Sequence, residues 1–542
     1  MKQTLSGNII DIHARRIYGG TVTIDDGRIV AVEEDGHTYD RYLAPGLVDA
    51  HVHIESSMLT PEEFARTVIA HGTVAVVSDP HEIANVMGPE GIAFMEAHAR
   101  RAAIKIRYTI PSCVPATAFD RSGGQITADD VERMAASGRF VGLSEVMDMP
   151  AVLGREPEMM RKLDAARRHG LPVDGHAPGA TGEPLRQYIA AGITTDHEAF
   201  TLAEAREKLA LGMKILIREG SAARNYAALH PVLDTQPDRV MFCMDDAHPH
   251  DLLTGHIDKL VRRALADGHD LFDVWRAASL NPVLHYGLPV GLLRPGDPAD
   301  FCILDNLTDL HTLEVWIDGE RRYDAANPPA FRPVVPEPFN RFVRQPIRPA
   351  DLRKACRGRV RCIGVLPGEL VTQDRTLAVA PTDNLEADLS QDLLKIVYLN
   401  RYTNDTPPQV AYLTGFGLRR GALAASVSHD SHNIIAIGSN DRDLARAINT
   451  VIEHRGGLSF AEGDRTVLQP LPIAGIMADC SAEEIATAWL RLSALRERGC
   501  RIDSPFMTLS FIALIVIPEL KLGEQGLFQF SRFRFLDEEK AS

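Results

Sequence analysis

The stretch LAPGLVDAHVHIESS (residues 43–57) marks a change in the pattern of the sequence. Before it, short β-branched runs alternate with turn residues, as in GGTVTIDDGRIVAVEEDG (19–36), where Asp26-Gly27 predicts a tight hairpin. After it, as far as Tyr286, apolar runs of strand length alternate with amphipathic stretches that end at glycine. The quoted stretch therefore begins a series of strand–helix units.

This series repeats about eight times over roughly 240 residues, which is the size and order of a (β/α)8 barrel. A doubly wound open sheet would show the same alternation, but no GxGxxG follows the first strand. Strand–turn–strand patterns return in residues 293–306 and 311–324, and we expect them to form one small β-domain with the N-terminal hairpins. A Pro-rich stretch (327–339) predicts a linker to a separate domain.

The predicted fold class is therefore α/β. It combines a TIM-like (β/α)8 barrel, a small flanking β-domain built from both sides of the barrel, and a C-terminal α+β domain. The expected bounds are 1–43 and 287–335 for the two parts of the β-domain, 44–286 for the barrel and 340–542 for the C-terminal domain.

Composition narrows the class of protein. The chain has 542 residues, 45% of them hydrophobic and 24% charged, and its formal net charge of −15 disfavours nucleic acid as a partner. The seven cysteines form no CxxC pair and no secretory signal is visible, which predicts a reduced cytoplasmic enzyme. The longest apolar run, Phe506 to Ile517, has 12 residues. It is too short to span a membrane and predicts a buried strand or core segment.

Polar side chains follow the apolar runs where barrel strands would end, which is where barrel enzymes build their active sites. These residues are His51, His53, His81, Glu82, Glu145, His176, His197, Asp245 and Asp246. His51 and His53 alternate along a strand and share one face, so both imidazoles can reach one metal ion. Imidazole combined with carboxylate suits Zn, Fe or Mn better than Ca or Mg.

Each of these residues alone has an ordinary structural explanation. Glu145 could form a buried ion pair with an arginine, because a bare carboxylate inside a barrel is costly. His176 or His197 could be a hydrogen-bonded core histidine, and two surface histidines would explain the HxH. Asp245 could bind a metal or accept a proton from water. Because so many suitable residues fall at successive strand ends, we predict a metal site.

Long blocks of the sequence resemble the bacterial adenine deaminases, a family of the amidohydrolase superfamily. In the barrel these blocks are DAHVHIESSM (49–58), SDPHEIANVMG (78–88), SEVMDMP (144–150) and MDDAHPHDL (244–252). Past the barrel they are GFGLRRGALAASVSHDSHNIIAIGSND (415–441), LPIAGIMAD (471–479) and FMTLSFIALIVIPELKLGEQGLF (506–528). The resemblance covers nearly the whole chain.

The resemblance implies a ligand set and a metal. Many amidohydrolases bridge two ions with a carboxylated lysine at the fourth strand; Glu145 stands there in this sequence and takes the bridging role. The implied ligands are His51, His53, Glu145, His176, His197 and Asp245. The implied ions are Mn²⁺ or Fe²⁺, as a binuclear pair, with Zn²⁺ as an alternative. Met244 departs from the small polar residue expected there, which leaves the finer shape of the pocket open.

The implied reaction is the hydrolytic deamination of adenine to hypoxanthine and ammonia. A metal-activated hydroxide would attack C6, with Asp245 accepting the proton of the water. Glu82, with His81 beside it, would protonate the ring. His81-Glu82 could instead start a helix, with Glu82 at its positive N-terminus.

The stretch SVSHDSHN (426–433) contains three possible accessory residues, His429, Asp430 and His432, and Asp246 is a fourth. The stretch could bind a further metal or cover the barrel mouth. It could equally be a hydrogen-bonded turn between strands, because Asp, Ser and Asn favour turns.

Two other functions fit the predicted fold. A cyclic-amide hydrolase of the dihydroorotase or hydantoinase type would share the barrel, but those enzymes usually carry the strand-four lysine. A non-catalytic metal-binding homologue would be favoured by the loss of a strand-end ligand, and all of them are present. The expected partners are adenine and water, with no nucleic acid and no membrane, and the expected assembly is a homo-oligomer, a dimer.

Overall fold

The structure, a computed structural model, describes residues 2–221, 223–334 and 339–536. Part of the expected Pro-rich linker, residues 335–338, lies outside them. The contacts divide the chain into two units. Unit 1 comprises Met1–Pro80, Ala93–Ser112 and Thr127–Pro333, and unit 2 comprises His81–Ile92, Cys113–Ile126 and Val334–Ser542. Two short segments that interrupt the barrel sequence thus group with the C-terminal part of the chain.

Unit 1 contains the predicted barrel. Its eight parallel strands are β5 (Leu47–Val52), β6 (Thr73–Ser78), β7 (Lys105–Tyr108), β8 (Leu143–Val146), β9 (Val173–Gly175), β10 (Thr195–Asp196), β11 (Lys214–Arg218) and β12 (Val240–Cys243). A bridge between Ile110 and Leu143 continues the ladder past β7. A second bridge, between Val52 and Asp245, closes the barrel onto β5.

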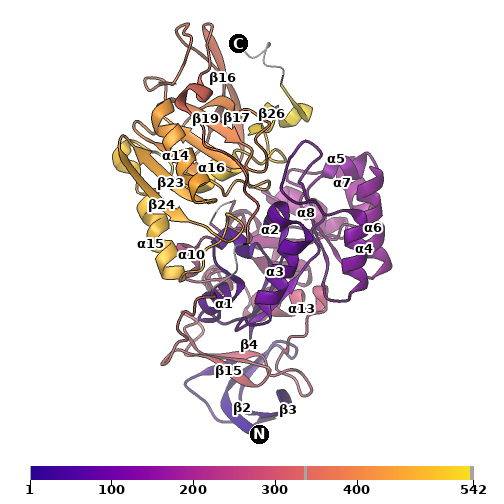
Figure 1. Cartoon of the computed structure of the whole chain (residues 1–542). Helices are drawn as coiled ribbons and strands as arrows, with labels where there is room; N and C mark the ends of the chain where they lie inside the picture. The colour runs from indigo at the N-terminus through magenta and orange to yellow at the C-terminus, as the bar shows by residue number, and fades with distance from the viewer. Residues whose placement is uncertain (1, 222, 335–338, 537–542) are drawn as a thin grey trace. The chain divides into compact units, whose positions relative to one another are not determined.

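Helices follow the strands and cover the outside of the barrel (Figure 1). The main ones are α1 (Pro61–Ile69), α3 (Pro89–Ala99), α4 (Ala128–Ala136), α6 (Pro157–Arg168), α7 (Gly182–Ala190), α8 (Leu202–Ala210), α11 (Ile257–Ala266) and α13 (Asn281–Tyr286). Helix α4 shows why they begin where they do. The Thr127 side chain accepts from the backbone N–H of Asp130, and the Asp130 side chain accepts from that of Thr127, a capping box that satisfies two free donors.

The small β-domain is also part of unit 1 and is built from both sides of the barrel sequence. Its seven strands are β1 (Gln3–Asp11), β2 (Arg16–Asp25), β3 (Arg28–Glu34), β4 (Tyr42–Pro45), β13 (Phe301–Leu304), β14 (Thr312–Ile317) and β15 (Glu320–Asp324). Figure 1 shows the indigo N-terminal strands and the pink strands from after the barrel in one layer. Asp26 and Gly27 join β2 to β3 with φ angles of 48° and 75°, so the predicted hairpin is confirmed.

Unit 2 is built on a nine-stranded sheet. The strands are β16 (Arg359–Val365), β17 (Thr372–Ala378), β18 (Ala387–Asp388), β19 (Leu393–Leu399), β20 (Gln409–Thr414), β21 (Ala422–Ala425), β22 (Ile434–Gly438), β23 (Gly457–Glu462) and β24 (Arg465–Pro470). Helix α14 (Asp441–Glu453) buries Leu444, Ile448 and Val451 in a core with β19 and β22. The unit also contains α2 (His81–Met87), α15 (Ala482–Ser493) and a small sheet of β25 (Leu520–Gly523), β26 (Gly526–Gln529) and β27 (Arg534–Phe535).

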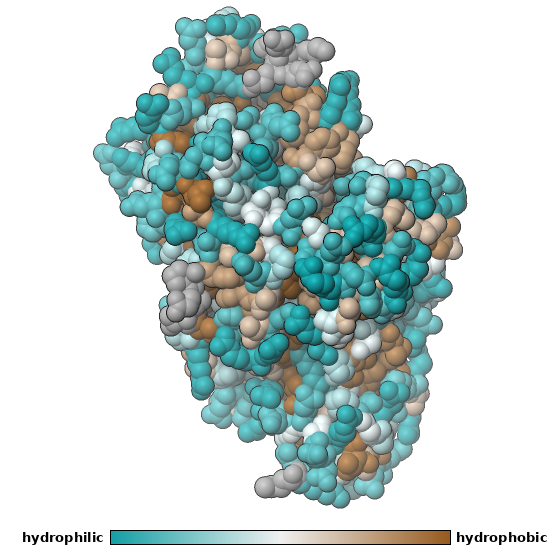
Figure 2. Space-filling model, turned by 45° about the vertical axis from the view of Figure 1, so that its right-hand side comes forward, coloured by the Kyte–Doolittle hydropathy of each residue, from teal (hydrophilic) through white to brown (hydrophobic). Residues whose placement is uncertain are grey.

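The long apolar run of the sequence lies in unit 2. It begins as a helix, α16 (Pro505–Phe511), and its apolar residues are buried, so the core segment is confirmed but its start is helical rather than a strand. None of the helices within the described residues is long and apolar enough to cross a membrane. In Figure 2 hydrophilic residues cover most of the visible surface, with small apolar patches between them.

Candidate metal centre

The end of β5 presents the first two histidines of the cluster, His51 and His53. His51 and His53 are buried, and the carboxylate of Asp49 holds the backbone here, accepting the N–H groups of His51 at 3.1 Å and Met244 at 3.2 Å. Nδ1 of His53 lies 3.2 Å from the carbonyl oxygen of Asp79. A carbonyl can only accept, so this nitrogen carries a proton, and the other ring nitrogen, Nε2, is directed at the carboxylates of the cluster. Nε2 is therefore the atom through which His53 would bind a metal ion.

Glu145, at the end of β8, lies between two pairs of histidines. Its Oε1 is 3.3 Å from Nε2 of His53 and 3.9 Å from Nε2 of His51. Its Oε2 is 2.6 Å from Nδ1 of His176 and 3.2 Å from Nε2 of His197. Each carboxylate oxygen thus faces its own pair of imidazoles, from β5 on one side and from β9 and β10 on the other.

Asp245 completes the group directly after β12. Its φ of 58° is unusual for a residue other than glycine, and its backbone is held by bonds to β5, with its N–H on the carbonyl of His51 at 2.9 Å. The carboxylate Oδ1 lies 3.5 Å from Nε2 of His51 and 3.2 Å from Nε2 of His53. The six ligands implied by the resemblance are therefore brought together in one buried cluster of unit 1.

Two residues of this cluster were missed by the sequence reasoning. Glu198 directly follows His197, and its Oε1 lies 3.4 Å from Nε2 of that histidine. Arg218, the last residue of β11, bonds Glu198 and Asp245, each at 2.5 Å from Nη1. The sequence also allowed a buried ion pair between Glu145 and an arginine. A buried arginine is present, but it binds Glu198 and Asp245 and not Glu145. Arg218 ends the apolar run MKILIR (213–218) and Glu198 follows the predicted ligand His197, and these positions were the available signal.

The charges of the cluster shift its pKa values. Burial raises the pKa of Glu145, but His176 and His197 outweigh it and hold the pKa well below its usual range. For Asp245 burial is likewise outweighed, here chiefly by Arg218. Burial lowers the pKa of His197, yet Glu145 and its neighbours raise it well above normal. The carboxylates are therefore ionised, and protons on the histidines balance them.

A divalent cation fits this cluster. Nε2 of His51 and Nε2 of His176 are buried and have no hydrogen-bond partner among the described residues. A buried polar atom without a partner lowers the stability of the fold, unless a bound ion or ligand interacts with it. Three triads have ligand atoms within 4.8 Å of one another, namely His51–His53–Asp245, His51–Glu145–His197 and His176–His197–Glu198. An ion would take over the charge balance that protons provide in its absence.

The predicted acid Glu82 belongs to a second cluster, inside unit 2. It lies in the first turn of α2, so the helix-start interpretation is correct as far as the backbone is concerned. Its Oε1 is 2.5 Å from Nδ1 of His429, and its Oε2 bonds Nε2 of His432. Burial raises the pKa of Glu82, but His429 and His432 outweigh it and hold the pKa well below normal.

The SVSHDSHN stretch joins β21 to β22 and is a hydrogen-bonded turn, with the N–H of His432 on the carbonyl of Ser428 at 2.7 Å. The turn interpretation is thus confirmed, and the turn directs two histidines at Glu82. Asp430 lies 3.8 Å from Nε2 of His81. In unit 1, Asp246 accepts from the hydroxyl of Ser56 at 2.5 Å, a structural bond beside the cluster.

Comparison with known proteins identifies the family of this chain. The amidohydrolase family model matches residues 42–323, and the model of the adenine deaminase C-terminal domain matches residues 369–534. The chain therefore belongs to the amidohydrolases, a class of hydrolases whose membership implies a divalent metal. Adenine deaminases of Methanosarcina mazei and Salinibacter ruber are 47% and 48% identical to it, each over 98% of both chains. Within its class, this chain is a member of the adenine deaminase family.

Similarity to solved structures is weaker. An N-acetyl-D-glucosamine-6-phosphate deacetylase from Mycobacterium smegmatis is 18% identical, with a TM-score of 0.45 over 59% of this chain and 99% of that one. The barrel assignment accordingly rests on the strand order described above and on the family match. The resemblance predicted from the sequence is confirmed by the full-length relatives.

Proposed function

We propose that this chain deaminates adenine hydrolytically, giving hypoxanthine and ammonia, at the metal centre of unit 1. The observation that carries the proposal is Glu145, each oxygen of which faces a different pair of histidines. It is supported by the relatives of matching length, which are named adenine deaminases. A divalent ion held by these histidines and carboxylates would supply Lewis acidity, which would activate water for attack at neutral pH.

The ligand set we propose is His51, His53, Glu145, His176, His197 and Asp245. Glu145 would be shared between two ions, because each of its two carboxylate oxygens faces a different pair of histidines. Manganese or iron is our preferred metal, with zinc as the alternative, since histidine and carboxylate accept all three. The dimer and the cytoplasmic location expected from the sequence stay predictions.

Asp245 is our candidate for accepting the proton that the attacking water loses. Its Oδ2 is bound by Arg218 at 2.5 Å, while Oδ1 is directed at the histidines. Arg218 keeps this carboxylate ionised, as the lowered pKa of Asp245 reflects. An ionised carboxylate in a fixed orientation can accept a proton from a water held beside it.

Glu82 is our candidate for moving a proton to the purine ring. The Ser428 N–H donates to Nδ1 of His432 at 3.2 Å, so Nε2 carries the ring proton and donates it to Glu82. Nδ1 of His429 lies within hydrogen-bond distance of the other carboxylate oxygen of Glu82, Oε1. The low pKa keeps Glu82 ionised at rest, so it would act as a relay that takes a proton from one of these histidines and passes it to the ring. His81, 3.6 Å from Oε1 of Glu82, would assist it.

An assay of ammonia release tests the proposal. Protein loaded with Mn²⁺ or Fe²⁺ is supplied with adenine, adenosine, cytosine and a cyclic amide such as dihydroorotate. We expect turnover of adenine with loss of its absorbance as hypoxanthine forms. Turnover of the cyclic amide in place of adenine would favour the cyclic-amide hydrolase. Metal retention without turnover of any substrate would favour a non-catalytic homologue.

A further inference from the structure

A cavity of unit 1 lies toward the opposite end of the barrel from the metal ligands. It has a volume of about 680 Å³. It is lined by the end of α3, the loop from α3 to β7, the whole of β7, the loop between α4 and β8, and the β3, β14 and β15 region of the small β-domain. The metal ligands follow the C-terminal strand ends, whereas Ile104 and Lys105 of this cavity precede or begin β7. Cavities of this size hold drug-sized small molecules.

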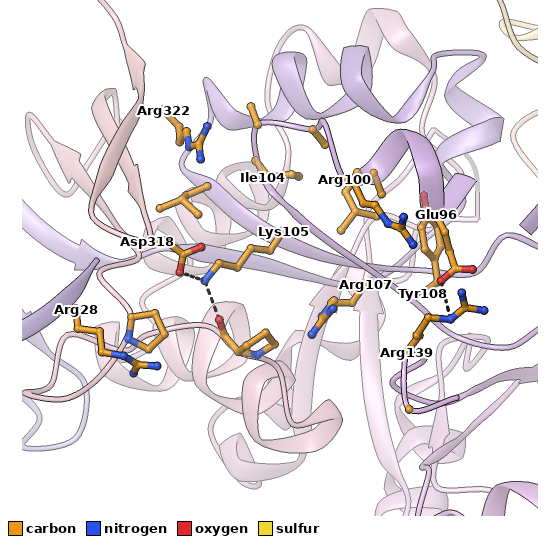
Figure 3. A pocket seen from close by; sticks show the side chains of 18 residues that line it. Arg28, Glu96, Arg100, Ile104, Lys105, Arg107, Tyr108, Arg139, Asp318 and Arg322 are labelled. Carbon is orange, nitrogen blue, oxygen red and sulfur yellow. Dashed lines mark hydrogen bonds and ion pairs between the residues drawn. The ribbon is translucent and has the colours of Figure 1, made fainter. Parts of the chain in front are cut away.

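The lining of this cavity is strongly basic in an acidic protein. Figure 3 shows the cationic side chains across the cavity, from Arg28 and Arg322 on one side to Arg100 and Arg139 on the other, with Lys105 and Arg107 between them. Only Glu96 and Asp318 among the lining residues are carboxylates. The chain as a whole carries a formal charge of −15. Positive charge is therefore concentrated at this cavity although the chain as a whole is negative. Such a concentration of positive charge attracts small anions.

Part of this positive charge is not neutralised by the protein. Lys105 is bound by Asp318 at 2.7 Å and by Asp300 at 2.8 Å, and Arg139 lies 3.4 Å from Glu96. Arg107, in contrast, makes no ion pair among the described residues, and its buried Nε has no hydrogen-bond partner. A buried donor without a partner is costly. Such a group points to an anion that would satisfy it.

The remaining wall of the cavity is apolar. Ile104, Ile106 and Ile317 line it together with Pro289 and Pro298. A free inorganic anion would leave this surface unused, whereas a ligand with an anionic end and a flat or apolar body would cover both parts. Guanidinium groups bind phosphate with paired hydrogen bonds, and arginine is the commonest charge here.

We propose that this cavity binds a phosphorylated small molecule of nucleotide size, with Arg107 as its central phosphate ligand. The cavity lies toward the opposite end of the barrel from the metal centre, so the ligand would bind without displacing adenine. Binding only to the folded chain would also raise its melting temperature. The site would thus couple the level of a phosphorylated metabolite to the stability of the enzyme.

Isothermal titration of the metal-loaded protein tests the proposal, with excess Mg²⁺ present so that the ligands do not strip the metal centre. The probes are GTP, inorganic pyrophosphate and guanosine. We expect GTP to bind, guanosine to bind far more weakly, and affinity to fall as salt rises. Tighter binding of GTP than of pyrophosphate identifies a nucleotide as the source of the phosphate. Equal binding of the two identifies a free polyphosphate.

Three variants locate the site. Arg107→Gln should weaken GTP binding at least about tenfold, as expected for a charge-assisted bond, and Arg100→Gln, at the exposed rim, should weaken it less. Arg206→Gln, an exposed arginine of α8, is the matched control and should bind as wild type. Adenine turnover without GTP should be the same in all four proteins. The proposal is overturned if GTP does not bind, or if it binds Arg107→Gln and Arg100→Gln as tightly as wild type.

Discussion

Arg218 binds the carboxylate of Asp245 at 2.5 Å from the end of the neighbouring strand, and this bond fixes the orientation of Asp245 toward the histidines. The same Nη1 lies 2.5 Å from Glu198, so one buried guanidinium holds two carboxylates. Removing one partner of a buried, hydrogen-bonded charge leaves the others uncompensated. Arg218 is therefore a positioning residue of the metal centre.

Replacing Arg218 with glutamine should lower kcat for adenine about 10²-fold, because the proposed base loses its orientation. Metal content should stay at the wild-type level or rise, because removal of a positive charge makes the cluster more attractive to cations. Steady-state kinetics and elemental analysis of the same samples measure both. Arg263→Gln, which breaks a partly exposed pair with Glu219, is the control. Unchanged kcat in Arg218→Gln would contradict the assignment.

Asp49 should act on the metal through the backbone of β5. Its Oδ1 accepts the N–H groups of His51 and Met244, and its Oδ2 lies 2.9 Å from Nε2 of His256. Supporting groups of this kind typically contribute about 10–100-fold to metal affinity. Asp49→Ala removes this acceptor and should weaken metal binding at least about tenfold in a chelator competition. Asp129→Ala, at an exposed ion pair, should not change it. Equal affinities in the two variants would exclude this role.

Glu82 should act on turnover and not on the metal. Glu82→Gln removes the carboxylate that His429 and His432 bond. We expect kcat to fall about 10²–10⁴-fold, the usual contribution of a positioned proton donor, with metal content unchanged. His432→Asn should show a smaller loss, because His429 still meets Glu82. A loss of metal in Glu82→Gln, or normal turnover, would show that Glu82 does not have this role.

The sequence indicated the metal ligands because each ends an apolar run, and parallel barrel strands bring their ends to one rim. His51 and His53 were predicted from their alternation along a strand, from the series of polar residues at strand ends and from the family resemblance, and the structure places both in the cluster. The bonding partner of Asp245 could not be predicted in the same way. An arginine at a strand end is typical of a solvated surface, and only the packing of β11 against β12 brings Arg218 to Asp245.

The bonding partners of Glu82 could not be predicted from the sequence either. Glu82 and His432 are separated by 350 residues, and no local pattern links them. The SVSHDSHN stretch has the composition of a turn, which it is, and its histidines meet Glu82 only because α2 folds with unit 2. The helix at the start of residues 506–517 was also unpredictable, because a short apolar run does not distinguish a buried helix from a buried strand.

Lys521 should make stability depend on pH. Burial lowers its pKa to about 7, and its ammonium group donates to the carbonyls of Leu370 and Phe511. Between this pKa and the ordinary lysine pKa of 10.5, the unfolded chain binds a proton that the folded chain lacks. The free energy of unfolding should therefore rise with pH from 7 to 10, by up to about 1.4 kcal/mol per pH unit.

The variant Lys521→Met should lose this part of the pH dependence. Thermal unfolding of both proteins at pH 7, 8.5 and 10 measures it, and the difference between them isolates the lysine from other titrating groups. The melting temperature of wild type should rise relative to that of the variant as the pH increases. Parallel curves for the two proteins would show that Lys521 keeps an ordinary pKa.

The central claim is that Glu145 holds the metal centre together, with one oxygen for each pair of histidines. The most direct measurement is the metal content and adenine turnover of Glu145→Gln, beside Glu132→Gln, an exposed glutamate, as the control. We predict that Glu145→Gln loses bound metal and that kcat falls at least about 10²-fold, while the control matches wild type. Full metal content together with wild-type turnover in Glu145→Gln would contradict the account.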